Sequence, residues 1–256
     1  MVTGASRGIG RVLTERLTSN GWQVVAVGTS ADHLDAVADA TGATPIVLDV
    51  SDAAAVSDAW SRVTSRFGVP DLLVNNAGVS GASGTTWTQD PAGWWRVFEV
   101  NVLGTFLMSR AAVPSMITAG AGRIVNVASN AAFYPVDGEE DSPIASAYMA
   151  SKAAVIRFTE ALAAEVARHG ITAFAISPGM VRTDMTAGVF ADLWDEPDVW
   201  TPAETTADLV EHLASGALDP MSGRYIHAAN DDWRALADRA DAVLAADLHS
   251  LRVRSS

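Results

Sequence analysis

Hydrophobic positions along this chain follow two alternating patterns. Short runs rich in Val and Ile indicate buried strands, and longer stretches with apolar residues every three or four positions indicate helices. The predicted strands are Val24–Val27, Ile46–Val50, Leu72–Asn75, Ile124–Ala128, Thr172–Ser177 and Arg224–His227. The predicted helices are Gly10–Ser19, Asp32–Ala40, Ala53–Phe67, Trp94–Met116, Ser151–Arg168 and Thr205–Ala214.

This alternation of strands and helices predicts an α/β fold. Strands that are apolar throughout are typical of a parallel sheet covered by helices on both faces, and right-handed crossovers wind it into an open, doubly wound sheet. No repeat or linker divides the chain, so a single domain over residues 1–256 is expected. A central first strand should have about five residues, yet only Met1 and Val2 precede Thr3. Either preceding residues are missing, which we favour, or this strand is unusually short.

Two segments depart from the alternation. Residues 184–200 mix large apolar and acidic side chains without a strand pattern, which predicts a loop-and-helix flap. From Asp231 to Leu251, apolar residues recur every three or four positions. This tail is therefore expected to form an amphipathic helix that buries one face, either on the body of the protein or on a partner subunit.

The composition excludes several kinds of function. The 256 residues carry 17 basic and 30 acidic side chains, a formal net charge of −13, and no cysteine. A disulfide framework, thiol catalysis and a cysteine-ligated metal are excluded, and no metal site is expected. The acidic balance disfavours nucleic acids and anionic membranes as partners. The chain has no apolar run of about 18 residues, so no membrane span is expected. It also lacks the layout of a signal peptide, so we expect a cytoplasmic location.

A glycine-rich turn follows the remnant of the first strand. Residues 3–10 read Thr-Gly-Ala-Ser-Arg-Gly-Ile-Gly and lead directly into a predicted helix. Glycines at positions 4, 8 and 10 permit a tight turn and a close backbone approach, while the free N–H groups of the helix can bind a pyrophosphate. The sequence therefore suggests a dinucleotide-binding site, although such a turn can also be only a turn.

The end of the second strand bears on the type of dinucleotide. A carboxylate there would bind the adenosine ribose and repel a 2′-phosphate, but the chain continues as Gly28, Thr29 and Ser30, with no acid before Asp32. Arg7 can reach a phosphate, and Thr29 and Ser30 offer hydroxyl donors. We therefore predict NADP(H) rather than NAD(H); the alternative is a solvated Arg7 without a ligand.

One tyrosine and one lysine stand at helical spacing. Tyr148 and Lys152 lie four residues apart and so share one face of a helix; Lys152 is the only lysine and Tyr148 one of three tyrosines. A phenol with a pKa of about 10 is a poor base at neutral pH, and a neighbouring cation is expected to lower that pKa. The pair therefore suggests a proton-transferring site.

With these motifs, the chain resembles the short-chain dehydrogenases/reductases, whose signatures are a Thr-Gly-x-x-x-Gly-x-Gly turn and a Tyr-x-x-x-Lys pair. The resemblance extends to about Ile226 and implies a Rossmann-type, doubly wound sheet, a nicotinamide cofactor and homo-oligomers. Further matches are Asp49 at the end of the third strand, the Asn-Asn-Ala-Gly run 75–78 after the fourth, Asn101 on a helix, Ser129 after the fifth strand, and Pro178–Thr183 after the sixth.

The resemblance also implies roles for these residues. Ser129 would donate a hydrogen bond to the substrate oxygen, and Tyr148 would exchange the proton. Lys152 would hold the ribose of the nicotinamide and lower the pKa of Tyr148, and Asn101 would position a water that links Lys152 to solvent. Asp49 would bind the adenine amino group. The predicted cofactor site comprises Gly4, Ser6, Arg7, Gly8, Ile9, Gly10, Thr29, Ser30, Asp49, Val50, Asn76, Ala77, Gly78, Tyr148, Lys152, Pro178, Gly179, Val181 and Thr183.

The chain departs from the family pattern between Ser129 and Tyr148, where the interval is several residues longer than usual. The extra length lies in 133–143, which includes the acidic run 137–141. A surface bulge is the favoured interpretation, and an acidic rim that filters substrates is the alternative. Ser142 fits the usual spacing better by count, but Ser129 closes the strand and is the predicted catalytic serine.

The expected function is NADP(H)-dependent interconversion of a carbonyl and an alcohol. The aromatic residues of the flap, with Ala131–Tyr134, favour an apolar or medium-sized ketone or aldehyde. An acyl-carrier-protein ketoreductase is the runner-up. It is less favoured because its acidic partner would need a basic patch, which is hard to assemble at a net charge of −13, although one could form locally around Arg96 and Arg110. A non-catalytic dinucleotide-binding regulator is the other alternative. The resemblance implies a homodimer or homotetramer built through helices Trp94–Met116 and Ser151–Arg168.

Overall fold

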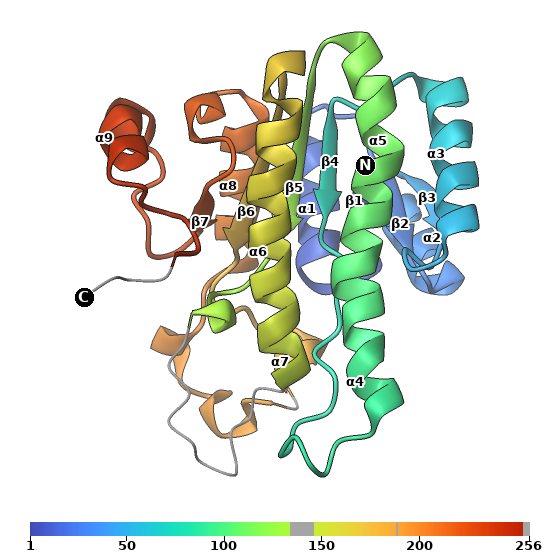
Figure 1. Cartoon of the computed structure of the whole chain (residues 1–256). Helices are drawn as coiled ribbons and strands as arrows, with labels where there is room; N and C mark the ends of the chain where they lie inside the picture. Colours follow the sequence, from blue (N-terminus) through green and yellow to red (C-terminus); the bar gives the residue numbers. More distant parts are fainter. Residues whose placement is uncertain (134–145, 188, 253–256) are drawn as a thin grey trace.

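In the computed structural model, which describes residues 1–133, 146–187 and 189–252, one sheet of seven parallel strands forms the centre of the molecule (Figure 1). The strand order is β3-β2-β1-β4-β5-β6-β7, so the chain reverses its direction of winding between β1 and β4. The strands are β1 Val2–Thr3, β2 Val25–Gly28, β3 Thr44–Val47, β4 Leu72–Asn75, β5 Gly122–Val127, β6 Ile171–Ser177 and β7 Tyr225–His227. This confirms the predicted doubly wound α/β fold.

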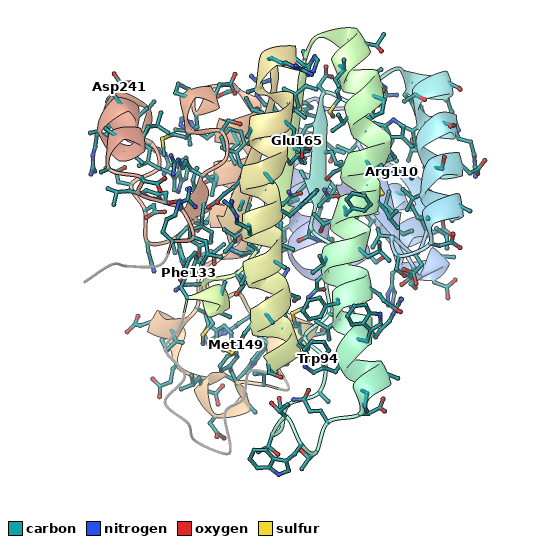
Figure 2. All side chains as sticks on the ribbon, in the orientation of Figure 1. Trp94, Arg110, Phe133, Met149, Glu165 and Asp241 are labelled. Carbon is teal, nitrogen blue, oxygen red and sulfur yellow. The ribbon has the colours of Figure 1, made fainter. Side chains whose placement is uncertain are left out.

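Helices cover both faces of the sheet and bury its apolar strands. One layer is formed by α1 (Gly8–Ser19), α2 (Ala31–Thr41) and α8 (Ala203–Ala214), whose Leu13, Leu34 and Leu209 belong to one core cluster. The opposite layer is formed by α3 (Ala53–Phe67), α5 (Thr105–Ala119) and α6 (Ser146–Val166), which share a second cluster (Figures 1 and 2). Because every strand is covered on both sides, few polar residues occur within them.

The helix predicted over Trp94–Met116 is longer and is interrupted. It comprises α4 (Pro91–Phe98), a π-helical segment over Glu99–Gly104, and α5. In the described residues this 29-residue run, which contains an 18-residue window with a mean hydropathy of 1.3, is the one helix long and apolar enough to cross a membrane. That is weak evidence for a span, because core helices pass the same test, and α5 packs its buried residues against the sheet.

Three other predicted elements differ clearly from the structure, and the bounds of the remaining ones agree to within two residues. Helix α6 begins at Ser146 rather than Ser151 and so includes Tyr148 in its first turn. Strand β3 covers Thr44–Val47 instead of Ile46–Val50. The tail, predicted as one amphipathic helix, is broken into a 3₁₀ turn (Ala237–Arg239) and the short helix α9 (Ala240–Ala245). The tail nevertheless packs on the body of its own chain, with Trp233, Leu236, Ala240 and Val243 in the first core cluster.

Both outer strands of the sheet have features that limit further pairing. Pro45 lies within β3, where it supplies no backbone donor. At the opposite edge, the backbone N–H of Tyr225 in β7 donates to the carbonyl oxygen of His249 in the tail at 2.8 Å. The flap contains α7 (Asp184–Ala187) and 3₁₀ turns at Ala191–Leu193 and Pro197–Val199, as a loop-and-helix segment was expected to.

Candidate functional site

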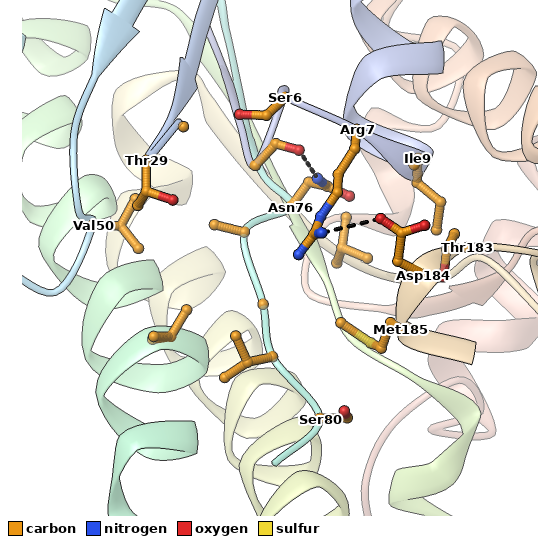
Figure 3. A pocket seen from close by; sticks show the side chains of 18 of the residues that line it. Ser6, Arg7, Ile9, Thr29, Val50, Asn76, Ser80, Thr183, Asp184 and Met185 are labelled. Atoms are coloured by element: carbon orange, nitrogen blue, oxygen red, sulfur yellow. Dashed lines mark hydrogen bonds and ion pairs between the residues drawn. The ribbon is translucent and has the colours of Figure 1, made fainter. Parts of the chain in front are cut away.

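A cavity of about 750 Å³ opens at the carboxyl ends of the strands, where the winding direction reverses between β1 and β4. In doubly wound sheets this switch point is where ligands bind. Every residue predicted for the cofactor site lines this large cavity except Gly10, and Ser129 lines it as well; Asn101 does not (Figure 3). Further lining residues, which the sequence analysis did not assign to the cofactor site, include His33, Leu48, Arg96 and Asp184.

The glycine turn forms one wall of the large cavity and requires its glycines. Gly4 and Gly8 adopt φ values of +65° and +54°, a conformation that favours glycine. Gly10 lies beneath the surface, where an added Cβ would stand 2.2 Å from the carbonyl oxygen of Gly4. The turn can therefore be built only without side chains at these positions.

The helix that follows the turn is suited to an anion. Its N-cap residue, Arg7, makes no side-chain capping hydrogen bond, and no acid lies in the first turn of α1. By contrast Ser30, Asp52 and Asp90 cap α2, α3 and α4. The first N–H groups of α1 consequently remain without a side-chain cap next to the cavity, as pyrophosphate binding requires. The site fits a dinucleotide.

The end of β2 contributes hydroxyl groups and no carboxylate. Gly28 packs so closely on Ser6 that an added Cβ would lie 2.1 Å from Ser6 Oγ. Thr29, Ser30 and His33 follow along the cavity, and Ser30 Oγ accepts the His33 backbone N–H as the cap of α2. His33 is a residue that the sequence reasoning missed, because its periodicity marks it only as a helix position.

Arg7, expected to contact a phosphate, pairs with Asp184 of the flap. The Arg7 Nη1 atom lies 3.0 Å from Asp184 Oδ2, and both side chains are exposed. Figure 3 shows the two pointing toward one another across the cavity. The exposed pair is weak enough for a bound phosphate to replace the carboxylate as the partner of Arg7.

Asp49, expected to bind adenine, already has partners on both oxygens. Its Oδ1 accepts hydrogen bonds from the backbone and hydroxyl of Ser51, and its Oδ2 lies 2.6 Å from Arg96 Nη2. Burial raises the pKa of Asp49, but these hydrogen bonds from Ser51 and Arg96 outweigh it, so the pKa lies below its ordinary value. Arg96 is a further wall residue, absent from the predicted site because it lies 47 positions away from Asp49.

The Asn-Asn-Ala-Gly run after β4 is held to the glycine turn by hydrogen bonds. Thr3 Oγ1 accepts the backbone N–H groups of Asn76 and Ala77, each at 3.0 Å, while Asn76 Nδ2 donates to the carbonyl oxygen of Thr3 at 2.9 Å. Asn75 is buried and donates to Asn126 at 2.9 Å and to Ser109 at 3.2 Å. The two loops that face the switch point are thereby fixed relative to one another.

Asn101 is buried in the π-helical segment and fastens three elements together. Its Oδ1 accepts the N–H of Val79 at 2.9 Å, and its Nδ2 donates to the Val79 carbonyl oxygen and to Ser151 Oγ, each at 3.0 Å. The side chain thus joins the loop after β4 to helix α6. In the described part of the chain, Asn101 therefore positions the loop after β4 relative to α6.

Ser129, Tyr148 and Lys152 converge at the base of the large cavity. Burial raises the pKa of Tyr148, while a hydrogen bond with Ser129 acts in the opposite direction. The ammonium of Lys152 lies 5.5 Å from the centroid of the Tyr148 ring and donates to the Val127 carbonyl oxygen at 2.7 Å. Burial lowers the pKa of Lys152 to about 8.

These pKa shifts differ from the expectation that Lys152 lowers the pKa of Tyr148. The ammonium stands over the ring rather than at the hydroxyl, and its charge is directed to a backbone carbonyl. The removal of the phenol from water is therefore the dominant effect, and Tyr148 holds its proton more firmly than a free tyrosine does.

The Pro178–Thr183 segment closes the other side of the large cavity. Gly179 adopts φ +83°, and an added Cβ there would lie 2.3 Å from Thr201 Oγ1. The Thr183 N–H donates to Thr186 Oγ1 at 2.9 Å. This pairing ties the segment to the start of the flap.

A small cavity of about 270 Å³ adjoins the large one, and Ser129 and Tyr148 line both. Its other walls include the loop after β4, Ala131, the flap through Met185, Val189 and Phe190, and His227 at the end of β7 with Asn230 just beyond it. The tryptophans of the flap do not line it: Trp194 and Trp200 pack on each other and on Arg182. Tyr134, the acidic run 137–141 and Ser142 lie outside the described residues.

No group of three or more histidine and acidic side chains is arranged to hold a metal among the residues described.

His227 and Asn230, which line the small cavity, were missed by sequence reasoning. Their one signal is their position at the end of the last strand and just beyond it, because the carboxyl end of that strand faces the site.

Comparison with known proteins identifies the family. A short chain dehydrogenase family model matches residues 1–194. The chain is 37% identical to "Short chain dehydrogenase mpl6" of Monascus purpureus, over 96% of this chain and 85% of that protein. It is 32% identical to the 3-oxoacyl-(acyl-carrier-protein) reductase FabG of Escherichia coli (strain K12), over 89% and 93%. A solved structure described as a putative gluconate dehydrogenase from Agrobacterium tumefaciens superposes with a TM-score of 0.78 at 28% identity, covering 88% of this chain and 92% of that one. The chain therefore belongs to the short-chain dehydrogenase/reductase family and is an oxidoreductase that uses a nicotinamide dinucleotide.

Proposed function

We propose that this protein interconverts a carbonyl and an alcohol with NADP(H), using Tyr148 as the acid and base. The observation that carries the proposal is that Ser129 and Tyr148 stand at the junction of the two cavities and line both. A carbonyl group in the small cavity can then reach the two hydroxyl groups and at the same time face the large cavity.

The side chains have separate parts in this reaction. Ser129 donates a hydrogen bond to the carbonyl oxygen and stabilises the negative charge that develops there. Tyr148, whose raised pKa keeps it protonated at neutral pH, transfers its hydroxyl proton to that oxygen during reduction and takes it back during oxidation. Lys152, with a pKa of about 8, is mainly cationic at neutral pH and electrostatically assists the phenolate left behind.

The nicotinamide dinucleotide, when bound, supplies or accepts the hydride. The glycine turn and the first turn of α1 would hold its pyrophosphate, and the Asn76–Gly78 loop and Pro178–Thr183 would border the rest. Asn101 keeps the Asn76–Gly78 loop against α6 through its bonds to Val79 and Ser151.

The preference for NADP(H) rests on the end of β2. Thr29, Ser30 and His33 line the cavity there and no acidic side chain does, whereas Arg7 lies nearby with a replaceable partner. The test is the ratio of kcat/KM for NADPH and NADH in wild type and Arg7→Ala. We expect at least a tenfold preference for NADPH that Arg7→Ala reduces; a tenfold preference for NADH would refute the assignment.

The substrate is expected to be an apolar or medium-sized ketone or aldehyde, since the small cavity is lined by Met185, Val189 and Phe190 of the flap. Following NADPH absorbance with a panel of ketones, aldehydes and acyl thioesters tests this. No turnover of any carbonyl compound would overturn the proposed function.

Reduction of an acyl-carrier-protein thioester is a second candidate, which the similarity to FabG favours. Against it, Arg96 of the suggested basic patch is paired with Asp49 and Glu99. The assay compares a 3-oxoacyl group on acyl carrier protein with the same group on a short pantetheine-like thiol. A large advantage for the protein-bound form would favour this candidate.

We also propose a homo-oligomer formed through the α4–α5 run and α6. Trp95, Leu103 and Phe106 are exposed along the first of these, and Phe106 contacts Phe158 of α6 edge to face. Exposed apolar side chains of this size, gathered on one face, are typical of an interface. Sedimentation analysis distinguishes a monomer, a dimer and a tetramer. A cytoplasmic location remains part of the proposal.

A further inference from the structure

His227 places a neutral hydrogen-bond donor in the wall of the small cavity. It is the last residue of β7, and 7% of its surface is accessible. The small cavity that it lines also contains the Ser129 and Tyr148 hydroxyl groups. Because β7 runs parallel to β6, its carboxyl end lies at the same edge of the sheet as the catalytic residues.

The backbone fixes which ring nitrogen of His227 carries the proton. Its Nδ1 accepts hydrogen bonds from the backbone N–H groups of Ala229 at 3.2 Å and Asn230 at 3.1 Å. A nitrogen that accepts two N–H groups is unprotonated, so the neutral ring must carry its hydrogen on Nε2. Burial lowers the pKa of His227, with Asp231 acting in the opposite direction, so the ring is neutral at neutral pH.

The Nε2–H group of His227 has no hydrogen-bond partner within the described part of the chain. The protein does not enclose this nitrogen completely. It therefore has accessible surface, and the small cavity is the space that His227 lines. A substrate that fills the cavity takes water away from this donor, so it must supply an acceptor in its place or leave the donor unpaired at a cost.

The other walls of the small cavity define the kind of acceptor. Among its described lining residues there is no Asp, Glu, Lys or Arg. A carboxylate or phosphate would find no countercharge there, whereas an uncharged oxygen needs only one donor. The acceptor that fits is a carbonyl, ester or hydroxyl oxygen.

We propose that His227 determines substrate specificity by donating its Nε2–H to a second, uncharged oxygen of a substrate whose first oxygen is bound by Ser129 and Tyr148. The substrate class is thus an uncharged ketone or aldehyde that carries an additional oxygen acceptor. This inference rests on the proposed carbonyl reduction and adds to it the chemistry of the substrate.

The first test concerns the tautomer and needs no substrate. ¹⁵N spectra of the histidine side chains at neutral pH, with His227 assigned by comparison with His227→Phe, should show a protonated Nε2 and an unprotonated Nδ1. A proton on Nδ1 would overturn the inference and leave the proposed reaction intact.

The second test uses two ketones of the same chain length, ethyl 3-oxobutanoate and 2-heptanone, of which only the first has additional oxygens. Two variants separate donation by Nε2–H from the support that Nδ1 gives to the turn after β7. His227→Asn keeps an acceptor for the Ala229 and Asn230 amides but lacks a donor at the Nε2 position. His227→Gln can bring an amide N–H close to that position.

We expect His227→Asn to lose roughly tenfold more kcat/KM on the oxo ester than on 2-heptanone, and His227→Gln to recover most of that loss. An equal effect on both ketones would assign His227 a structural part only and overturn the inference. If the wild type reduces neither ketone and no other carbonyl, the proposed function itself fails.

Discussion

Tyr148 and Lys152 illustrate how burial acts on single residues at this site. Burial favours the neutral form of both, raising the pKa of the phenol and lowering that of the amine to about 8. The phenol therefore begins as a proton donor, which suits reduction of a carbonyl. The pKa of the amine lies only about one unit above neutral pH, so changes in the surroundings of the site can change its charge.

Replacing Tyr148 by Phe removes the proton donor and little volume. We expect kcat to fall by about 10²–10⁴, the usual contribution of a general acid, with the Kd for NADPH changed less than about threefold. Steady-state kinetics and fluorescence titration measure the two quantities. Turnover within tenfold of the wild type would refute the role of Tyr148; a parallel loss of NADPH binding would indicate a damaged site.

Lys152→Met should stabilise the protein while abolishing turnover. The pKa of Lys152 falls from 10.5 to about 8, equivalent to an upper limit of about 3 kcal/mol for keeping its charge buried. Below pH 8 both the folded and unfolded chains are protonated and the full cost applies. Between pH 8 and 10.5 the folded chain loses the proton first, so the wild type gains stability as the pH rises.

The advantage of Lys152→Met in unfolding free energy should therefore be greatest below pH 8 and disappear above pH 10.5. It will fall short of the upper limit, because the Val127 carbonyl oxygen loses its donor. Denaturant unfolding at several pH values measures it. A variant less stable than the wild type at pH 7, or a difference that does not change with pH, would contradict this assignment.

At the scale of elements, the glycine turn and α1 depend on the close approach of Gly10 to Gly4 and Asn76. An added Cβ at Gly10 would stand 2.2 Å from the Gly4 carbonyl oxygen, so Gly10→Ala must displace the turn. We expect a loss of about 1–3 kcal/mol of stability together with weakened dinucleotide binding. Thermal unfolding and titration with NADPH measure both effects.

Gly93→Ala is the matched control within another helix. Its Cβ would lie 3.4 Å from Asp90 Oδ2, an ordinary contact, and α4 should gain roughly 0.5–1 kcal/mol from the lower flexibility of the unfolded chain. If Gly10→Ala behaves like this control, the close approach of α1 to the turn is not required.

The sequence predicted the elements whose signals are local. Continuous Val and Ile runs located the strands, and the glycine turn and the Tyr148–Lys152 spacing identified residues that line one cavity. The tail was predicted as one helix because its apolar spacing is regular, but tertiary packing of Trp233 and Leu236 replaced part of the helix. The places of Arg96 and His227 in the cavity walls were missed because they depend on contacts between distant segments.

At the scale of the whole molecule, the tail belongs to the core. Trp233 is 3% exposed, donates its ring N–H to the Ala228 carbonyl oxygen at 2.9 Å and packs against His212 of α8. Residues after β7 thus complete the layer formed by α1 and α8. The same segment carries the chain past His227 and Asn230, so its packing also shapes the small cavity.

Trp233→Ala should therefore cost about 3–5 kcal/mol of unfolding free energy, the range for a buried aromatic residue. Trp87→Ala is the comparison, since Trp87 is 78% exposed and should change stability by less than about 0.5 kcal/mol. Denaturant unfolding of both variants provides the measurement. Similar small effects would mean that the tail is dispensable for folding.

The proline in β3 and the bond from Tyr225 to the tail have a consequence beyond this one molecule. Adding strands side by side, the commonest route by which open sheets aggregate, is hindered at both margins. The proposed association through the helical layers would therefore not have to compete with fibre-like growth along the edges of the sheet.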